Sequence, residues 1–173
     1  MWILFLLACA STLPTSNSAR QLELEKVYDR YHFAFPKVRE TSALEVKQRL
    51  SSGDPIVLID VRPENERSVS IIPGAISLDE FNSHREDYRD KTAITYCTVG
   101  VRSGIEASKL RREGVEVENM QGSILGWTLL GGELVRPDGT PTKQVHVYGK
   151  RWNYAADGYS AVINNHDGTL RPL

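Results

Sequence analysis

A cysteine, with an arginine five positions later, is the pair of residues in this chain best suited to chemistry. Cys97 follows residues 93–96, whose apolar character predicts a buried strand, and it precedes a glycine-containing turn and a helix expected from Ser103. Backbone N–H groups at the start of a helix lack intrahelical partners and, with the helix dipole, favour a thiolate over a thiol. Arg102 adds a permanent positive charge. We therefore expect a nucleophilic sulfur, the plainer alternative being a buried core cysteine.

Length and composition limit what surrounds this sulfur. The chain of 173 residues suits one folded domain with appendages, and 40% hydrophobic with 25% charged residues is typical of folded soluble proteins. A net charge of −1 does not indicate nucleic-acid binding. Two cysteines are too few for a disulfide framework or a structural zinc site, and the four histidines lack ligand spacing. We expect neither a metal nor a cofactor.

Two further motifs precede the cysteine in the chain. An apolar run at 56–59 leads into Asp60-Val61-Arg62, and Ile72-Pro73-Gly74-Ala75 follows it. Together with residues 97–103, spaced C-x-x-G-x-R-S, they resemble the ordered motifs of the single-domain rhodaneses. The resemblance covers residues 36–132 and implies a rhodanese-like three-layer α/β domain with a central parallel β-sheet flanked by helices. The alternation of predicted strands and helices independently favours a parallel sheet covered on both faces.

The resemblance also implies an activity, that of a sulfurtransferase. Cys97 would be the catalytic residue, taking a sulfane sulfur as a persulfide from thiosulfate or another persulfide and passing it to cyanide or a thiol. Asp60 and Arg62 would support the loop, with Ser103 capping the helix that follows. The residues implied to form the substrate-binding loop are Thr98, Val99, Gly100, Val101, Arg102 and Ser103.

Three functional hypotheses fit this loop. The first is the sulfurtransferase, and the second is a rhodanese-like sulfur carrier or partner-binding module without multiple turnover. The third, a phosphatase or arsenate reductase, is disfavoured because those related loops place five residues between cysteine and arginine, whereas four lie between Cys97 and Arg102. Thr98, Val99 and Val101 put no positive charge in the loop, so we expect weak attraction of thiosulfate and favour a persulfide donor.

The N-terminal residues 1–19 are typical of an export signal or lipoprotein leader followed by a linker. An apolar run at 2–8 is too short for a bilayer span, which needs about 20 residues, and small polar residues follow it. Leu6-Leu7-Ala8-Cys9 resembles the cleavage box of bacterial lipoproteins, in which the cysteine is lipidated. This pattern predicts a periplasmic protein or one anchored to the membrane through Cys9, and a cytoplasmic location is the alternative.

Two further segments flank the rhodanese-like region. Residues 20–35 predict an added helix, because apolar residues recur at the spacing of one helical face. Residues 133–173 predict a C-terminal extension that packs on the domain, and a docking surface for a protein partner is the alternative. Aromatic residues such as Trp152 and Tyr154 lie near basic ones there, but the charge balance does not favour nucleic acid.

Overall fold

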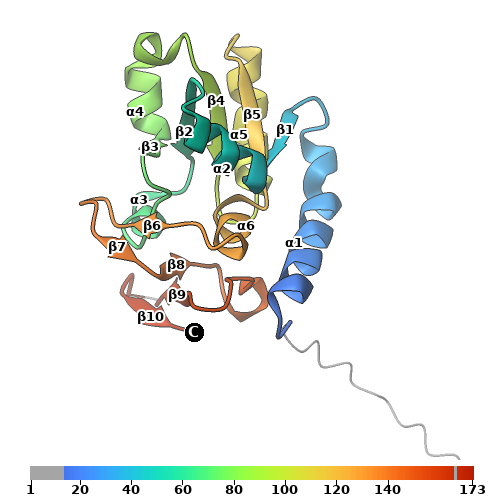
Figure 1. Ribbon diagram of the computed structural model, residues 1–173, viewed down its shortest axis with the longest axis vertical. Helices are drawn as coiled ribbons and strands as arrows, with labels where there is room; N and C mark the ends of the chain where they lie inside the picture. The colour runs from blue at the N-terminus through green and yellow to red at the C-terminus, as the bar shows by residue number, and fades with distance from the viewer. Residues whose placement is uncertain (1–13, 166) are drawn as a thin grey trace, which may run out of the picture.

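A five-stranded parallel sheet forms the centre of the molecule in the computed structural model, which describes residues 14–165 and 167–173 (Figure 1). The predicted export leader with Cys9 falls mainly in residues 1–13, outside the described residues. In spatial order the strands are β1 (Arg39–Ser42), β5 (Val117–Gln121), β4 (Thr92–Tyr96), β2 (Ile56–Asp60) and β3 (Ile76–Ser77). Within the described part of the chain, no helix combines the length and apolar character needed to cross a membrane.

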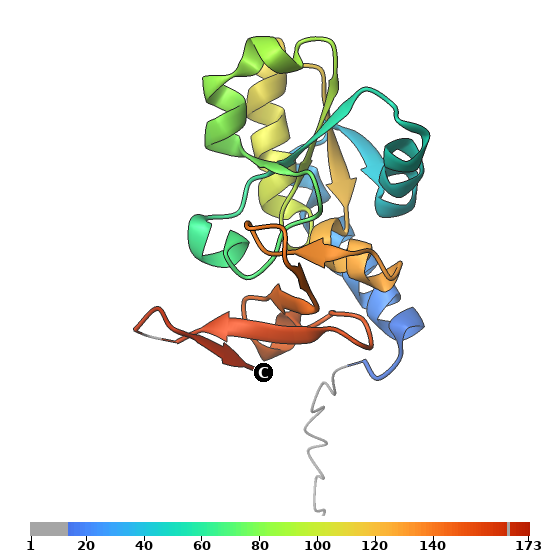
Figure 2. The same ribbon diagram turned by 60° about the vertical axis from the view of Figure 1, so that its left-hand side comes forward.

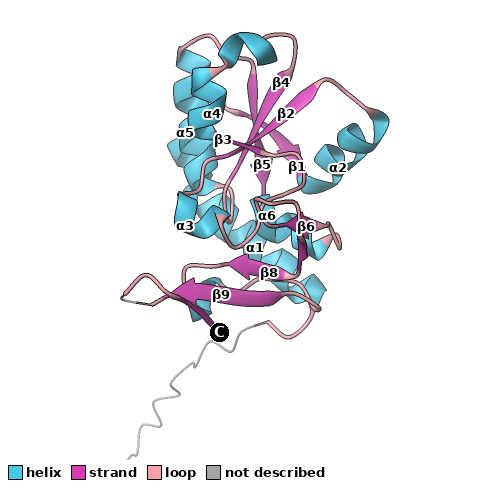
Figure 3. Ribbon diagram, turned by 90° about the vertical axis from the view of Figure 1, so that its left-hand side faces the viewer, coloured by secondary structure: helices cyan, strands magenta, loops and turns pink. Residues whose placement is uncertain are grey.

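Helices cover both faces of this sheet, which confirms the predicted three-layer α/β class (Figure 3). Alternate residues of β2 enter opposite core clusters, because successive side chains of a strand point to opposite faces. Ile56 and Leu58 pack on the side of α2 and α6, whereas Val57 and Ile59 pack on the side of α4 and α5. The helices of the domain are α2 (Ala43–Ser52), α3 (Glu64–Arg67), α4 (Leu78–Ser83), α5 (Val101–Arg112) and α6 (Ser123–Leu129).

The N-terminal helix α1 (Asn17–Tyr31) packs along the domain and touches both core clusters (Figure 1). It begins where the Ser16 side chain accepts a hydrogen bond from a backbone N–H of the first turn, the usual role of a serine N-cap. Leu24 joins the cluster on the α6 side, and Tyr28 joins the cluster on the α5 side. A short turn of 3₁₀ helix, His32–Ala34, then leads the chain to β1.

The C-terminal region forms two small sheets beside one end of the domain (Figures 1 and 2). Strands β6 (Leu134–Val135) and β7 (Pro141–Thr142) pair with each other, and β9 (Ser160–Asn164) lies between β8 (Gln144–His146) and β10 (Leu170–Pro172). Val145 and Val147 belong to the same buried cluster as Ile94 of the central sheet. An ion pair of 2.6 Å between Arg20 and Asp157 joins the extension to α1. The extension therefore shares its core with the domain.

The helix that follows Cys97 differs from the prediction at its start. Ser103 was expected to cap it, but α5 begins at Val101 with Gly100 as N-cap, and Ser103 lies within the first turn. Gly100 has a φ of +104°, a conformation glycine adopts readily, so the chain turns into the helix two residues earlier. In this helix Ile105 is 42% exposed, whereas Ala107 and Leu110 are buried.

The close approach of Gly100 to Tyr28 predicts a large stability loss in Gly100→Ala. A Cβ atom at this position would lie 2.6 Å from Cε2 of Tyr28, in addition to the strain of the positive φ. Backbone strain alone costs about 1–3 kcal/mol, so we expect a larger loss here. Gly139→Ala is the matched control, since φ is +84° and nothing lies within 4 Å of the added atom. Equal losses of unfolding free energy in urea would contradict the role of the tyrosine.

Candidate active site

The sulfur of Cys97 lies directly after β4, where two groups hydrogen-bond to it. The Gly100 N–H donates to Sγ at 3.2 Å, and the Ser103 hydroxyl lies 3.5 Å from the same atom. The backbone N–H of Cys97 donates to the Ser123 hydroxyl at 2.9 Å, which ties the end of β4 to the start of α6. Cys97 is a free thiol and only 1% exposed. Contacts with the start of α5 and the start of α6 therefore hold the thiol in one position.

The surroundings of Cys97 favour its ionised form. Burial alone would raise the pKa of the Cys97 thiol, but the hydrogen bond from Ser103 and the charge of Arg102 outweigh it. Backbone N–H groups at the start of α5 act in the same direction, so the pKa lies below its ordinary value. This arrangement supplies a thiolate without a neighbouring general base, which fits a nucleophile for sulfur or carbon electrophiles.

Arg102 is held by Glu66, a residue that no feature of the sequence singles out. Its guanidinium donates to both carboxylate oxygens of Glu66, at 2.9 and 2.7 Å. The Thr98 hydroxyl completes the group, donating to Glu66 at 3.3 Å and accepting from Arg102 at 3.2 Å. In the sequence, Glu66 is one of several charged residues in the polar segment 64–70. Only the packing of α3 against the cysteine loop gives this glutamate its position.

Asp60 and Arg62 form a second ion pair, whose side chains are fully buried. The Arg62 guanidinium donates to Asp60 at 2.6 and 2.9 Å and to the backbone carbonyl of Ser70 at 2.6 Å. The bond to Ser70 fixes the segment that follows α3, and α3 itself carries Glu66. The Asp60–Arg62 pair thus supports the cysteine loop indirectly, through α3. A direct chemical role for the pair is not favoured.

The C-terminal extension brings three side chains to the site that the sequence did not indicate. Nδ1 of His146 lies 3.8 Å from the Glu66 carboxylate. Burial lowers the pKa of His146, and the positive charges of Arg62 and Arg102 add to this effect while the Glu66 carboxylate opposes it, so the pKa lies below its ordinary value. The Tyr148 ring lies 4.7 Å from the guanidinium carbon of Arg102, a cation–π distance, and contacts Trp152 edge to face.

A pocket of about 290 Å³ opens beside the sulfur. Most of its lining residues are aromatic or valine, and the extension and α1 both contribute to the lining. Its lining residues are Tyr31, Cys97, Val99, Val101, Arg102, Tyr148 and Trp152. Within residues 14–165 and 167–173, no group of three or more His, Cys, Asp or Glu side chains is placed to hold a metal ion.

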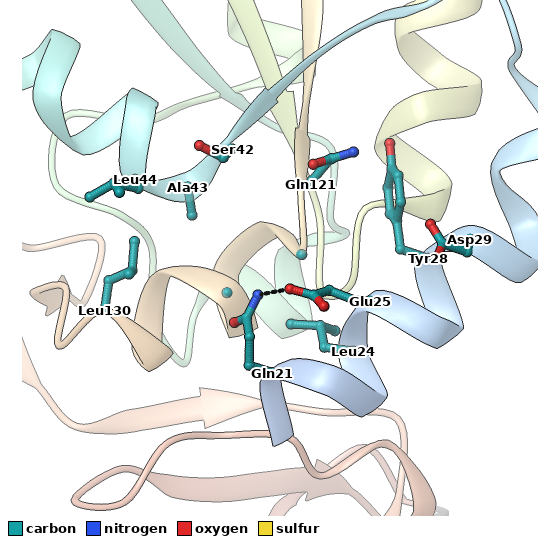
Figure 4. A pocket seen from close by; sticks show the side chains of 12 residues that line it. Gln21, Leu24, Glu25, Tyr28, Asp29, Ser42, Ala43, Leu44, Gln121 and Leu130 are labelled. Carbon is teal, nitrogen blue, oxygen red and sulfur yellow. Dashed lines mark hydrogen bonds between the residues drawn. The ribbon is translucent and has the colours of Figure 1, made fainter. Parts of the chain in front are cut away.

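A larger pocket of about 500 Å³ lies between α1, the start of α2 and α6 (Figure 4). It shares no lining residue with the pocket beside Cys97. Two of its polar side chains pair with each other, since Gln21 donates to Glu25 at 2.8 Å (Figure 4). No nucleophile with a lowered pKa lines this pocket, so the smaller pocket is the candidate active site.

The fold and the site together define a class of protein. Its members are parallel α/β domains that carry a nucleophilic cysteine between a strand and a helix, here β4 and α5. The family model described as Rhodanese-like domain matches residues 42–130, from the start of α2 to the end of α6. The chain belongs to the rhodanese-like domain family. Tyr31, Tyr148 and Trp152 lie outside the matched residues.

Named relatives agree with this family. A sulfurtransferase of Allochromatium vinosum is 29% identical over 106 residues, which are 59% of this chain and 99% of that protein. The tRNA uridine(34) hydroxylase of Xanthomonas campestris is 34% identical over 92 residues, 47% of this chain and 36% of the relative. The crystal structure of thiosulfate sulfurtransferase from Pseudomonas aeruginosa has a TM-score of 0.54 at 24% identity, covers 72% of this chain and 24% of that one, and supports the fold. Together, family and relatives support a sulfurtransferase-type role.

The contact between Ser103 and Cys97 predicts a change in the pH dependence of alkylation. The rate with iodoacetamide follows the thiolate fraction, which rises with pH until the thiol is fully ionised. Ser103→Ala removes a hydrogen bond that lowers the pKa of Cys97, so the midpoint should move to higher pH. Ser108→Ala, on the same helix but away from the sulfur, is the control. An unchanged midpoint in Ser103→Ala would show that the hydroxyl does not stabilise the thiolate.

Proposed function

We propose that the protein is a rhodanese-type sulfurtransferase that works through a persulfide on Cys97. The Cys97 thiolate attacks the outer sulfur of a sulfane donor, such as thiosulfate or a persulfide. The donor's S–S bond breaks, and its remainder, sulfite or a thiolate, leaves with the electron pair. A thiolate or cyanide then attacks the terminal sulfur of the Cys97 persulfide, and the Cys97 thiolate is regenerated.

The observation that carries the proposal is the lowered pKa of a buried thiol that accepts hydrogen bonds from Gly100 and Ser103. The same donors stabilise the negative charge when Cys97 is again the leaving thiolate in the second step. Because the contacts of Cys97 favour its thiolate, the proposed reaction assigns no residue as a general base. Arg102 positions the loop through Glu66.

Two alternatives have less support. A partner-binding module does not need the access to Cys97 that the pocket provides, and the sulfurtransferase-named relatives do not favour a sulfur carrier without turnover. A phosphatase needs a guanidinium free to bind the phosphate oxygens. Both terminal nitrogens of Arg102 already donate to Glu66, and the loop is one residue shorter than in phosphatases.

Intact mass spectrometry tests the first step. Protein exposed separately to thiosulfate and to a small-molecule persulfide should gain about 32 Da, one sulfur atom, in a form that a reductant removes. Cys97→Ser should gain nothing, because the hydroxyl is not a comparable nucleophile. Release of the sulfur as thiocyanate over many cycles with cyanide is expected of the enzyme. Release limited to one equivalent would support the carrier instead, and no mass gain from either donor would contradict the proposal.

Substitution of Arg102 tests the role of the Glu66 pair. Arg102→Ala should lower the sulfur-transfer rate about ten- to hundredfold, since charged hydrogen bonds are worth about 1.5–3 kcal/mol. Arg102→Lys should recover little of it, because an ammonium cannot make the two-point contact with a carboxylate. Arg111→Ala, on the exposed side of the same helix, is the control. Parent-like rates in both Arg102 variants would remove this residue from the site.

A further inference from the structure

Three aromatic side chains line the active-site pocket. Tyr31 comes from the end of α1, and Tyr148 and Trp152 come from the C-terminal extension. We call these three residues the aromatic wall. The rings of Tyr148 and Trp152 contact each other edge to face, with centroids 6.3 Å apart. All three lie outside the rhodanese-like match at 42–130, so the wall is an addition to the family domain.

The charge of the pocket does not suit a small dianion such as thiosulfate. Among its lining residues Arg102 alone carries a positive charge, and Glu66 holds both terminal nitrogens of that guanidinium. Tyr148 covers the guanidinium at 4.7 Å. Val99 and Val101 line the pocket from the cysteine loop and add no charge. A ligand here gains more from apolar contact with the rings than from electrostatic attraction.

We propose that the sulfur donor is a small organic sulfane-sulfur compound whose apolar, aryl-sized group packs against the aromatic wall. This inference rests on the proposed sulfur transfer by Cys97. The donor has the form R–S–S⁻, or R–SO₂–S⁻ for a thiosulfonate, with a single negative charge. Its outer sulfur meets the Cys97 thiolate while R occupies the space beside Tyr148 and Trp152.

Thiosulfonates are suitable probes because the group R can be changed at constant charge. The Cys97 thiolate attacks the sulfane sulfur of R–SO₂–S⁻, the S–S bond breaks, and the sulfinate R–SO₂⁻ leaves with the electron pair. The product is the Cys97 persulfide anion, so two negative charges are present before and after the step. Benzenethiosulfonate and methanethiosulfonate then differ in the group that would contact the wall.

The experiment compares these two donors with the full chain and cyanide as the acceptor. Each kcat/KM is divided by the rate constant of the same donor with free glutathione, which removes the difference in intrinsic reactivity. We expect the corrected ratio of benzene to methane donor to exceed about tenfold in the parent protein. Trp152→Ala should bring the ratio close to one, chiefly by raising KM for the benzene donor.

Two further variants make the test specific. Phe33→Ala removes an aromatic side chain that is 78% exposed and absent from the pocket lining, so its ratio should match the parent. Tyr148→Leu keeps apolar bulk but removes the ring. This variant replaces Trp152→Ala in the test if Trp152→Ala does not fold. A corrected ratio near one in the parent, or a parent-like ratio in the wall variants, would overturn this inference while Cys97 still gains sulfur. If neither donor nor thiosulfate loads Cys97, the proposed function fails, and the inference fails with it.

Discussion

The two-point ion pair between Glu66 and Arg102 is the contact on which the rest of the site depends. It joins α3 to the first turn of α5, and through Thr98 it holds the loop between β4 and α5. The Glu66 side chain is only 5% exposed, and a carboxylate so buried is costly unless it is paired. The pair therefore fixes the loop and also offsets part of the positive charge of Arg102, and these two consequences decide what chemistry the pocket accepts.

Two hydrogen-bond donors stabilise negative charge on the sulfur, in addition to the charge of Arg102. The Gly100 N–H and the Ser103 hydroxyl both lie within hydrogen-bonding distance of the sulfur. Such donors act on one atom at a fixed place, whereas a free guanidinium would attract any anion that enters. This geometry suits a sulfur that alternates between thiolate and persulfide. It offers little to a phosphate, whose several oxygens each need a donor.

The sequence was sufficient for the central domain because its signals are local. The apolar run at 56–59 and the strand, turn and helix around Cys97 each lie within a few residues, and their order along the chain matches one family. Glu66 and His146 carry no such signal, because their positions depend on segments that meet only after folding. The predicted role of Ser103 as a helix cap was wrong for a different reason. A positive φ at Gly100 moved the helix start by two residues, which turned an expected cap into a hydrogen-bond donor to sulfur.

The C-terminal extension contributes to the site because it shares a core with the domain. Val145 and Val147 are completely buried, in one cluster with Ile94 and Tyr96 of β4, the strand that directly precedes Cys97. The rings of Tyr148 and Trp152 are thus attached to backbone whose position is set during folding. A preformed wall does not need to be ordered when a ligand enters, so more of the contact energy remains for binding. The core that the extension shares with the domain thus has two results. It holds the extension in place, and it positions the rings that select the donor.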